Sequence, residues 1–215
     1  RNTYGFEHPT KSDPIFQKKH LGIFKTTTYT TAYEAHYPDW TKFYKAVKME
    51  GYGISMDNLL YSSSGIRQTK AESLGTKPKN GCTGYTANGD CVKIGRSIAV
   101  DPDIIPLGTP VEIEFLNKNG TICHTPICKN FNGVYYAVDK GGSVKKNHID
   151  IYVGPELGVS NGKVYHLGSR LPRKANIYTL RKPNDFSIEE LLTLDAPRIF
   201  HVKPRNYKRI ASGKI

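Results

Sequence analysis

The chain has 215 residues, 38% of them hydrophobic, and a formal net charge of +12 at pH 7. This is enough apolar material for one large domain with additions, and no apolar run reaches the roughly 18 residues that a membrane span needs, so we expect no transmembrane segment. The positive charge favours anionic partners such as nucleic acid, anionic lipid or cell-wall polymers. No ribonucleoprotein motif or zinc-finger spacing appears, so nucleic acid binding is not supported.

The first part of the chain predicts an arm, a strand and a helix. Residues 1–22 are polar with two prolines and predict an irregular N-terminal arm. Phe24–Tyr33 is rich in β-branched and aromatic residues, which is typical of a strand. Asp39 is a good N-cap for a short helix that ends at Gly51, and its apolar stripe comprises Trp40, Phe43, Tyr44 and Val47. Residues 34–81 read as an insertion, with only a weak helical patch at Met56–Tyr61.

The remainder of the chain is predominantly β in pattern. Asn119-Gly120 and Asn132-Gly133 predict hairpin-type turns, and this spacing of short strands favours a barrel or sandwich over an α/β fold. A capping box at Ser187–Glu190 opens a C-terminal helix through Leu194, followed by a basic tail, so residues 181–215 form a separate segment. The predicted strands are Ile98–Val100, Pro110–Leu116, Thr121–Ile127, Val134–Val138, Ile149–Val153 and Ala175–Leu180.

The four cysteines occur as two close pairs, Cys82 with Cys91 and Cys123 with Cys128. An even count in local pairs favours two disulfides and an oxidising compartment. Zinc is the alternative, but these gaps are wider than the usual two residues between zinc ligands. We therefore predict no metal site.

Three aspartates lie within or at the end of short apolar strands: Asp101, Asp139 and Asp150. A carboxylate is rarely buried without a partner, so three in such surroundings predict a cluster in a cleft. Clustered carboxylates raise one another's pKa, which leaves an acid that holds a proton near neutral pH. Cleavage of a glycosidic bond needs such an acid.

The motifs around these aspartates resemble the three-aspartate (3D) domain family, which includes the catalytic domain of membrane-bound lytic transglycosylase A and Gram-positive cell-wall proteins. The similarity spans roughly residues 29–180, and the order of its motifs agrees throughout. The matching segments are Thr31–Tyr33, Thr86–Gly89, Ile98–Thr109, Ala137–Val144, Asn147–Tyr152, Leu167–Gly168 and Ala175–Leu180.

The resemblance implies a mainly β, six-stranded double-psi β-barrel over residues 23–180, with short helices in the insertion and at the C-terminus. It implies a lytic transglycosylase that cleaves the MurNAc-β-1,4-GlcNAc bond of peptidoglycan and forms 1,6-anhydro-MurNAc. Asp150 resembles the family's catalytic acid/base, with Asp139 and Asp101 as supporting carboxylates. Two features depart from the family: Lys140 replaces the usual threonine after Asp139, and the insertion is longer than in compact members.

Several further residues are candidates for substrate binding. A tight turn at Gly141 and Gly142 allows a sugar close to the backbone, and His148 shares the strand face of Asp150. The remaining candidates are Lys93, Glu34 and Thr86.

Other interpretations stay open at this point. One is a glycan-binding double-psi module without activity, and another is a hydrolase of β-1,4-glycans in which a second carboxylate activates water. A third is a structural wall protein tethered by its basic tail. We expect a monomer without a cofactor, in the periplasm or outside the cell, with peptidoglycan as its partner.

Overall fold

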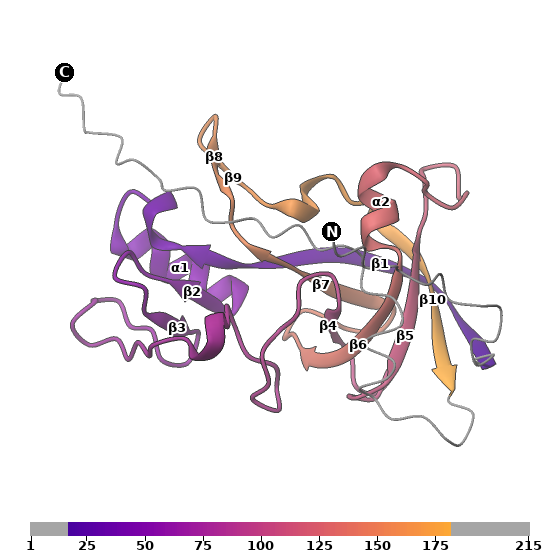
Figure 1. Cartoon of the computed structure of the whole chain (residues 1–215), viewed down its shortest axis with the longest axis horizontal. Coiled ribbons are helices and arrows are strands. Elements are labelled where there is room, and N and C mark those ends of the chain that lie inside the picture. The colour runs from indigo at the N-terminus through magenta and orange to yellow at the C-terminus, as the bar shows by residue number, and fades with distance from the viewer. Residues whose placement is uncertain (1–16, 182–215) are drawn as a thin grey trace, which may run out of the picture. The chain divides into compact units, whose positions relative to one another are not determined.

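The computed structural model describes residues 17–181, and six of its strands close into a barrel (Figure 1). Their order is β10-β5-β6-β4-β7-β1, and a further pairing of β10 with β1 closes the ring. The barrel strands are β1 (Gln17–Tyr33), β4 (Ser97–Val100), β5 (Pro110–Phe115), β6 (Gly133–Lys140), β7 (His148–Pro155) and β10 (Lys174–Arg181).

Two neighbouring pairs in this barrel are parallel, β1 with β7 and β4 with β6, and the other four pairs are antiparallel. Parallel neighbours need crossover connections, so the chain cannot wind as a simple meander. The predicted fold class, a mainly β double-psi barrel, is confirmed for the described residues.

The barrel interior is a continuous apolar core. Side chains alternate along β7, so that Ile149, Ile151 and Val153 point inward and are fully buried. Phe24, Ile98, Val100, Val111, Ile113 and Ile177 join them from the other strands. Since the inward face is filled, the residues between these positions lie on the outside of the barrel.

Strand β1 links the barrel to a second, smaller core. It begins at Gln17, seven residues before the predicted start at Phe24, because residues 17–20 already pair with β10. Its far end pairs with β2 (Tyr52–Ile54), which forms a hairpin with β3 (Leu60–Ser62). Figure 1 shows this long strand running from the barrel to the insertion.

The predicted helix in the insertion is confirmed as α1 (Trp40–Glu50). Asp39 Oδ1 accepts a hydrogen bond from Lys42 N at 2.8 Å, and Gly51 ends the helix with φ +91°. The helix packs closely on β2, since a Cβ on Gly53 would lie 2.3 Å from Val47 Cγ2. A buried cluster of Ala32, Phe43, Ala46, Val47, Tyr61 and Ile66 results.

Three local expectations were wrong, and one hairpin was not predicted. The helical patch at Met56–Tyr61 is wrong, because Leu60 and Tyr61 belong to β3. The strand predicted at Thr121–Ile127 is also wrong, since Thr125 caps a helix, α2 (Pro126–Phe131), with proline at its first position. For the same reason Asn132-Gly133 joins α2 to β6 and is not a hairpin turn. A small hairpin of β8 (Gly158–Ser160) and β9 (Lys163–Tyr165) follows β7 and was not predicted.

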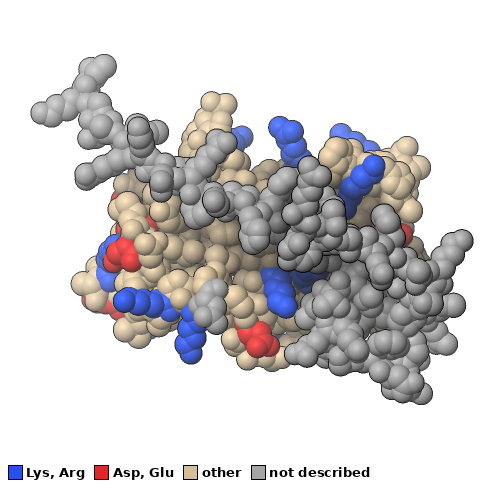
Figure 2. Space-filling view, in the orientation of Figure 1, with Lys and Arg blue, Asp and Glu red and all other residues tan. Residues whose placement is uncertain are grey.

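Short 3-10 helices occupy three connections, at Glu34–His36, Lys79–Gly81 and Leu167–Arg170. The predicted C-terminal helix, the basic tail and most of the N-terminal arm fall outside the described residues. Within residues 17–181, no helix is long and apolar enough to cross a membrane. On the face drawn in Figure 2, Lys and Arg side chains are spread over the surface in small groups.

Both predicted disulfides are present, Cys82–Cys91 and Cys123–Cys128. The first closes a loop whose Ala87 N–H donates to Val138 O at 3.2 Å. This loop therefore contacts β6 at Val138, one residue before Asp139. A short covalent loop limits the conformations of the unfolded chain and fixes this contact.

Candidate active site

Asp139 and Asp150 lie on the outer face of the barrel, one on each side of Ala99. Asp150 is directly opposite Ala99 on β4, and Ala99 pairs with Asp139 on β6. On the other side of Asp150, Thr27 of β1 is its register partner. We call these four residues, Asp139, Ala99, Asp150 and Thr27, the aspartate row. Two strand spacings separate the aspartate backbones, which is roughly 10 Å.

The outward direction of Asp139 depends on an irregularity of β6. Ala137 points into the core, and strict alternation would send Asp139 the same way. The register between β4 and β6 shifts between Ile98 and Ala99, so that Ile98 pairs with Ala137 while Ala99 pairs with Asp139. Such a bulge turns a side chain to the other face of a sheet, and here it brings Asp139 to the side of Asp150.

A hydrogen-bonded chain holds Asp150. Thr27 Oγ1 donates to Asp150 Oδ1 at 2.8 Å, and His148 Nε2 lies 2.8 Å from the same hydroxyl. His148 Nδ1 lies 3.3 Å from Ser143 O. When Thr27 donates to an ionised Asp150, Nε2 of His148 must carry a proton. The same atom positions accommodate the opposite order, in which a protonated Asp150 donates to Thr27 and Thr27 donates to His148.

Both carboxyls of the aspartate row are biased toward the protonated form. Burial raises the pKa of Asp150, while the hydrogen bond from Thr27 and the charge of His148 oppose this. Burial also raises the pKa of Asp139, and the negative charge of Asp150 raises it further, against the backbone N–H and the charge of Lys140. The charge of Asp150 therefore acts on Asp139 across the aspartate row.

Asp101 has a different environment from the other two aspartates. It follows β4, and its Oδ2 accepts a hydrogen bond from Lys146 N at 2.8 Å. This bond is the main reason why the pKa of Asp101 is lowered. Asp101 therefore remains ionised and ties down the loop between Asp139 and Asp150, which also carries Ser143. Neither carboxyl of the aspartate row contributes to its pKa shift.

The glycines after Asp139 form a tight turn. Val144 N donates to Gly141 O at 3.1 Å, and a Cβ on Gly141 would lie 2.6 Å from Val144 Cγ2. Gly142 has open space in the direction of a Cβ. The turn joins β6 to the loop that Asp101 holds, so the chain can return to Asp150 on β7 within eleven positions of Asp139.

The other predicted binding residues are engaged in local structure. Glu34 Oε2 accepts from Met56 N at 2.8 Å and lies 3.3 Å from Lys70 Nζ, within the insertion. Thr86 is buried, and its hydroxyl accepts from Asp90 N in the disulfide loop. Lys93 is exposed in the turn before β4. The structure thus places His148 beside Asp150 and leaves Glu34 in a separate cluster.

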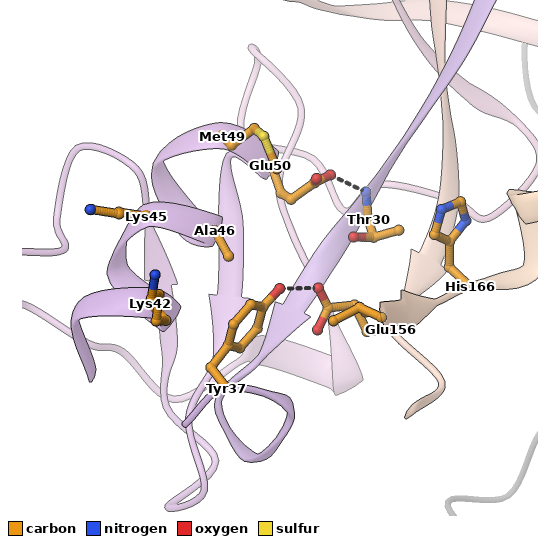
Figure 3. A pocket seen from close by; sticks show the side chains of 10 residues that line it. Thr30, Tyr37, Lys42, Lys45, Ala46, Met49, Glu50, Glu156 and His166 are labelled. Carbon is orange, nitrogen blue, oxygen red and sulfur yellow. Dashed lines mark hydrogen bonds between the residues drawn. The ribbon is translucent and has the colours of Figure 1, made fainter. Parts of the chain in front are cut away.

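A cavity of about 450 Å³ opens beside this region, between α1 and the β1 strand (Figure 3). Glu50 extends from the end of α1, and its Oε2 accepts a hydrogen bond from Thr30 N at 2.8 Å. Glu156 accepts from the hydroxyl of Tyr37 and from Tyr33 N. The full lining comprises Thr30, Tyr37, Lys42, Lys45, Ala46, Met49, Glu50, Glu156, Val164 and His166.

Glu50 is the most strongly perturbed carboxyl in this cavity. Burial raises its pKa to about 7, the N–H of Thr30 opposes this, and the charges of Asp150 and Glu156 add to the increase. Because Asp150 acts on Glu50, the cavity and the aspartate row lie within electrostatic reach of each other. Burial also lowers the pKa of His166, which therefore favours its neutral form.

We expect Glu50→Gln to stabilise the protein at alkaline pH. The folded pKa of Glu50 is raised from 4.5 to about 7, so its contribution to stability is fully present below about pH 4.5 and is lost as the pH rises to about 7. Glutamine still accepts from Thr30 and carries no charge. After a discount for partial solvent contact, the gain in unfolding free energy at pH 8 is about 1–3 kcal/mol, with little difference at pH 4.

Urea unfolding of both proteins at pH 4 and pH 8 measures this difference. Glu72→Gln, which neutralises an exposed glutamate of the same insertion, is the matched control. If the free energy of unfolding changed equally with pH in the Glu50→Gln variant and in the original protein, the cost of a buried charge at this position would be contradicted.

The sequence did not indicate Thr27, Tyr29 and Glu50 as neighbours of the aspartates, nor Glu156 as part of the adjoining cavity. Thr27 sits within the run Thr26–Thr28, so the sequence shows no preference for the one threonine that faces Asp150. Glu50 lies in a helix that was identified only by its apolar face. A glutamate that directly precedes the terminating Gly51 was the one available signal, since a negative charge at a helix C-terminus is unfavourable.

The fold and the site together define a closed double-psi barrel with two partly buried carboxyls of raised pKa on its outer face. Among residues 17–181, no group of three or more His, Cys, Asp or Glu side chains is arranged to hold a metal ion. The sequence profile of the 3D domain family matches residues 96–169, which contain all three aspartates. The resemblance to this family is therefore confirmed for that part of the chain.

Several characterised proteins are similar to parts of the chain. Membrane-bound lytic murein transglycosylase A of Escherichia coli strain K12 is 40% identical over 85 residues, which is 35% of this chain and 21% of that protein. The Vibrio cholerae protein of the same name is 37% identical over 76 residues, covering 34% and 20%. The putative cell wall shaping protein YabE of Bacillus subtilis is 29% identical over 112 residues, covering 51% and 24%.

This chain thus spans about a fifth of the length of the transglycosylases that it matches. Among solved structures, Escherichia coli MltA with bound chitohexaose aligns with a TM-score of 0.48 at 14% identity, covering 75% of this chain and 72% of that one. LtgG, a lytic transglycosylase of Burkholderia pseudomallei, aligns with a TM-score of 0.48 at 15% identity, covering 79% and 77%.

Proposed function

We propose that this protein is a peptidoglycan lytic transglycosylase that cleaves the MurNAc-β-1,4-GlcNAc bond, with Asp150 as its single acid/base. The observation that carries the proposal is the aspartate row, in which a partly buried carboxyl with a raised pKa lies two strands away from a second carboxyl of the same kind. The lytic murein transglycosylases among its relatives support the same chemistry.

The reaction needs one group that first gives and then takes a proton. Protonated Asp150 donates its proton to the glycosidic oxygen, and the bond from that oxygen to C1 of the muramic sugar breaks with its electron pair on the oxygen. Asp150, now a carboxylate, accepts the proton of the C6 hydroxyl while the C6 oxygen bonds to C1 and closes the 1,6-anhydro ring. Such acid/base action contributes about 10²–10⁴-fold to the rate.

The surroundings of Asp150 favour both of its roles, as the acid before cleavage and as the base after it. Burial favours the protonated acid before cleavage. After proton transfer, Thr27 donates to the carboxylate and accepts a hydrogen bond from the Nε2–H of His148. His148 and Thr27 thus act in this proposal as positioning residues for Asp150, and Asp101 holds the loop that bears the partner of His148.

The insertion supplies a second wall for the glycan. Its Tyr52 lies close enough to Asp139 that this carboxylate is one cause of the raised pKa of Tyr52. The cavity next to Glu50 extends the same region along β1. A protein that acts on this polymer works in the cell envelope, so we place it in the periplasm or outside the cell, in agreement with its two disulfides.

The test is mass spectrometry of purified peptidoglycan after digestion. The proposal predicts muropeptides that end in 1,6-anhydro-MurNAc. Products with reducing ends would assign hydrolysis instead, and a lack of products together with binding would leave a glycan-binding module.

Hydrolysis is the second candidate because of one observation, the raised pKa of Glu50. A carboxyl with a pKa of about 7 beside Asp150 is able to act as a base toward water, which an inverting hydrolase needs. Reducing-end products that disappear in Glu50→Gln would favour this alternative over lytic cleavage.

We expect Asp139→Asn to move the alkaline limb of the pH–rate profile to lower pH. The charge of Asp150 raises the pKa of Asp139, and repulsion between two carboxylates acts in both directions, so we expect removal of the Asp139 charge to make Asp150 ionise more readily. Activity requires protonated Asp150 and is lost as the pH rises through its pKa, so the variant loses activity at a lower pH than the original protein.

The measurement is the initial rate on one purified glycan from pH 4 to pH 9. Asp103→Asn removes an exposed carboxylate from the loop after β4 and changes the net charge equally, which makes it the control. An alkaline limb that stays in place or moves upward in Asp139→Asn would contradict the coupling.

A further inference from the structure

The hydroxyl of Tyr29 is buried beside both aspartates and has no hydrogen-bond partner among the described residues. Tyr29 follows Thr27 by two positions on β1, so it lies on the same outward face as the aspartate row. Burial raises the pKa of Tyr29 well above its usual value, and the charges of Asp139 and Asp150 contribute to the increase. The phenol therefore stays protonated and keeps a hydrogen atom to donate.

The neighbouring Tyr152 provides a direct comparison. It is the register partner of Tyr29 on β7, and the two ring centroids are 5.2 Å apart. Its hydroxyl bonds to the hydroxyl of Thr31 at 2.8 Å and to that of Thr83. The two tyrosines are adjacent on one face, and among the described residues only the hydroxyl of Tyr152 has hydrogen-bond partners.

A buried hydroxyl without a partner is unfavourable for folding, so its presence calls for a functional explanation, and a group that a ligand completes is one. Asp139 and Asp150 are both near, yet neither makes a hydrogen bond to Tyr29 among the described contacts. Whenever either carboxyl is ionised, its negative charge disfavours an anionic group at this position. A neutral oxygen atom of a ligand bound at the aspartate row therefore fits the missing partner.

We infer that the Tyr29 hydroxyl is a substrate contact, which donates a hydrogen bond to a hydroxyl or acetamido oxygen of the sugar bound at the aspartate row. The assignment rests on the proposed function, since it takes the ligand to be an N-acetylated glycan. In this role Tyr29 fixes the orientation of the sugar relative to Asp150.

The experiment compares Tyr29→Phe with Tyr152→Phe in the full chain. Three quantities are measured: the urea midpoint of unfolding, the affinity for an N-acetylglucosamine oligomer by calorimetry, and the cleavage rate on purified peptidoglycan. Each variant removes one hydroxyl from the same face and leaves the ring in place.

We expect Tyr29→Phe to be at least as stable as the original protein, because it removes an unsatisfied group. Its affinity for the oligomer falls about 3–10-fold, which is the loss of one neutral hydrogen bond. Tyr152→Phe is expected to unfold at a lower urea concentration, because it removes the hydrogen bond to the hydroxyl of Thr83 and one of the two hydrogen bonds of the Thr31 hydroxyl.

Two results would overturn the inference. The first is an affinity and a cleavage rate of Tyr29→Phe that equal those of the original protein. The second is a loss of stability in Tyr29→Phe as large as that in Tyr152→Phe, since the hydroxyl would then be bonded within the fold. A protein that binds the oligomer but releases no anhydro-muropeptides refutes the proposed activity, and the affinity comparison still decides the role of Tyr29.

Discussion

Asp150→Asn is expected to lower the release of anhydro-muropeptides about 10²–10⁴-fold, the usual contribution of a general acid/base. An amide has nearly the shape of the carboxyl, and its oxygen still accepts the hydrogen bond from Thr27. It can neither donate the proton that the leaving oxygen needs nor accept one from the C6 hydroxyl. Both halves of the proposed reaction therefore fail in this variant.

Measurements of stability and of glycan binding distinguish the loss of catalysis in Asp150→Asn from damage to the fold. Burial raises the pKa of Asp150, so its ionised form costs stability above its unfolded pKa, and a neutral amide removes that cost. The urea midpoint of Asp150→Asn at pH 7 is therefore expected to equal or exceed that of the original protein, with glycan binding retained. Substantial anhydro-product formation by the folded variant would refute the assignment of Asp150.

Ala99→Leu is expected to lower cleavage by about 10²-fold or more. Ala99 is 5% exposed and lies between the two aspartates in the aspartate row. Three added carbon atoms at this position must displace the neighbouring carboxyls or the substrate, and a displacement of about 1 Å at a reacting group can reduce the rate about 10²-fold.

Graded substitutions make this result interpretable. Ala99→Ser adds one small atom and is expected to stay close to the original rate, while Ala99→Val is expected to lie between serine and leucine. Rates are compared only among variants whose near-UV circular dichroism matches the original protein. Equal rates across a folded serine, valine and leucine series would contradict the tight packing between Asp139 and Asp150.

The sequence by itself determined the features that depend on local patterns. Alternation along Ile149–Ile151 placed Asp150 on the face opposite to the core, and the same period placed His148 beside it. The Asp39 cap and the Gly51 terminus set the bounds of α1, because capping involves only neighbouring residues. Close spacing likewise identified both disulfides.

Local patterns also misled where two signals competed. The apolar run Thr121–Ile127 has strand composition, but a capping threonine followed by proline begins α2 within it. Leu60 and Tyr61 looked weakly helical, yet pairing with β2 makes them a strand. Tertiary pairing outweighs weak propensity because each strand residue gains both backbone bonds and burial.

The composition of the site was decided by tertiary structure. Asp139 would face the core by strict alternation, and only the register shift against β4 turns it toward Asp150. Thr27 and Tyr29 reach the aspartates through the parallel pairing of β1 with β7, across more than 120 residues of sequence. Glu50 reaches the same region from a helix in the insertion. Register between distant strands depends on how the whole barrel closes, which no local pattern of residues specifies.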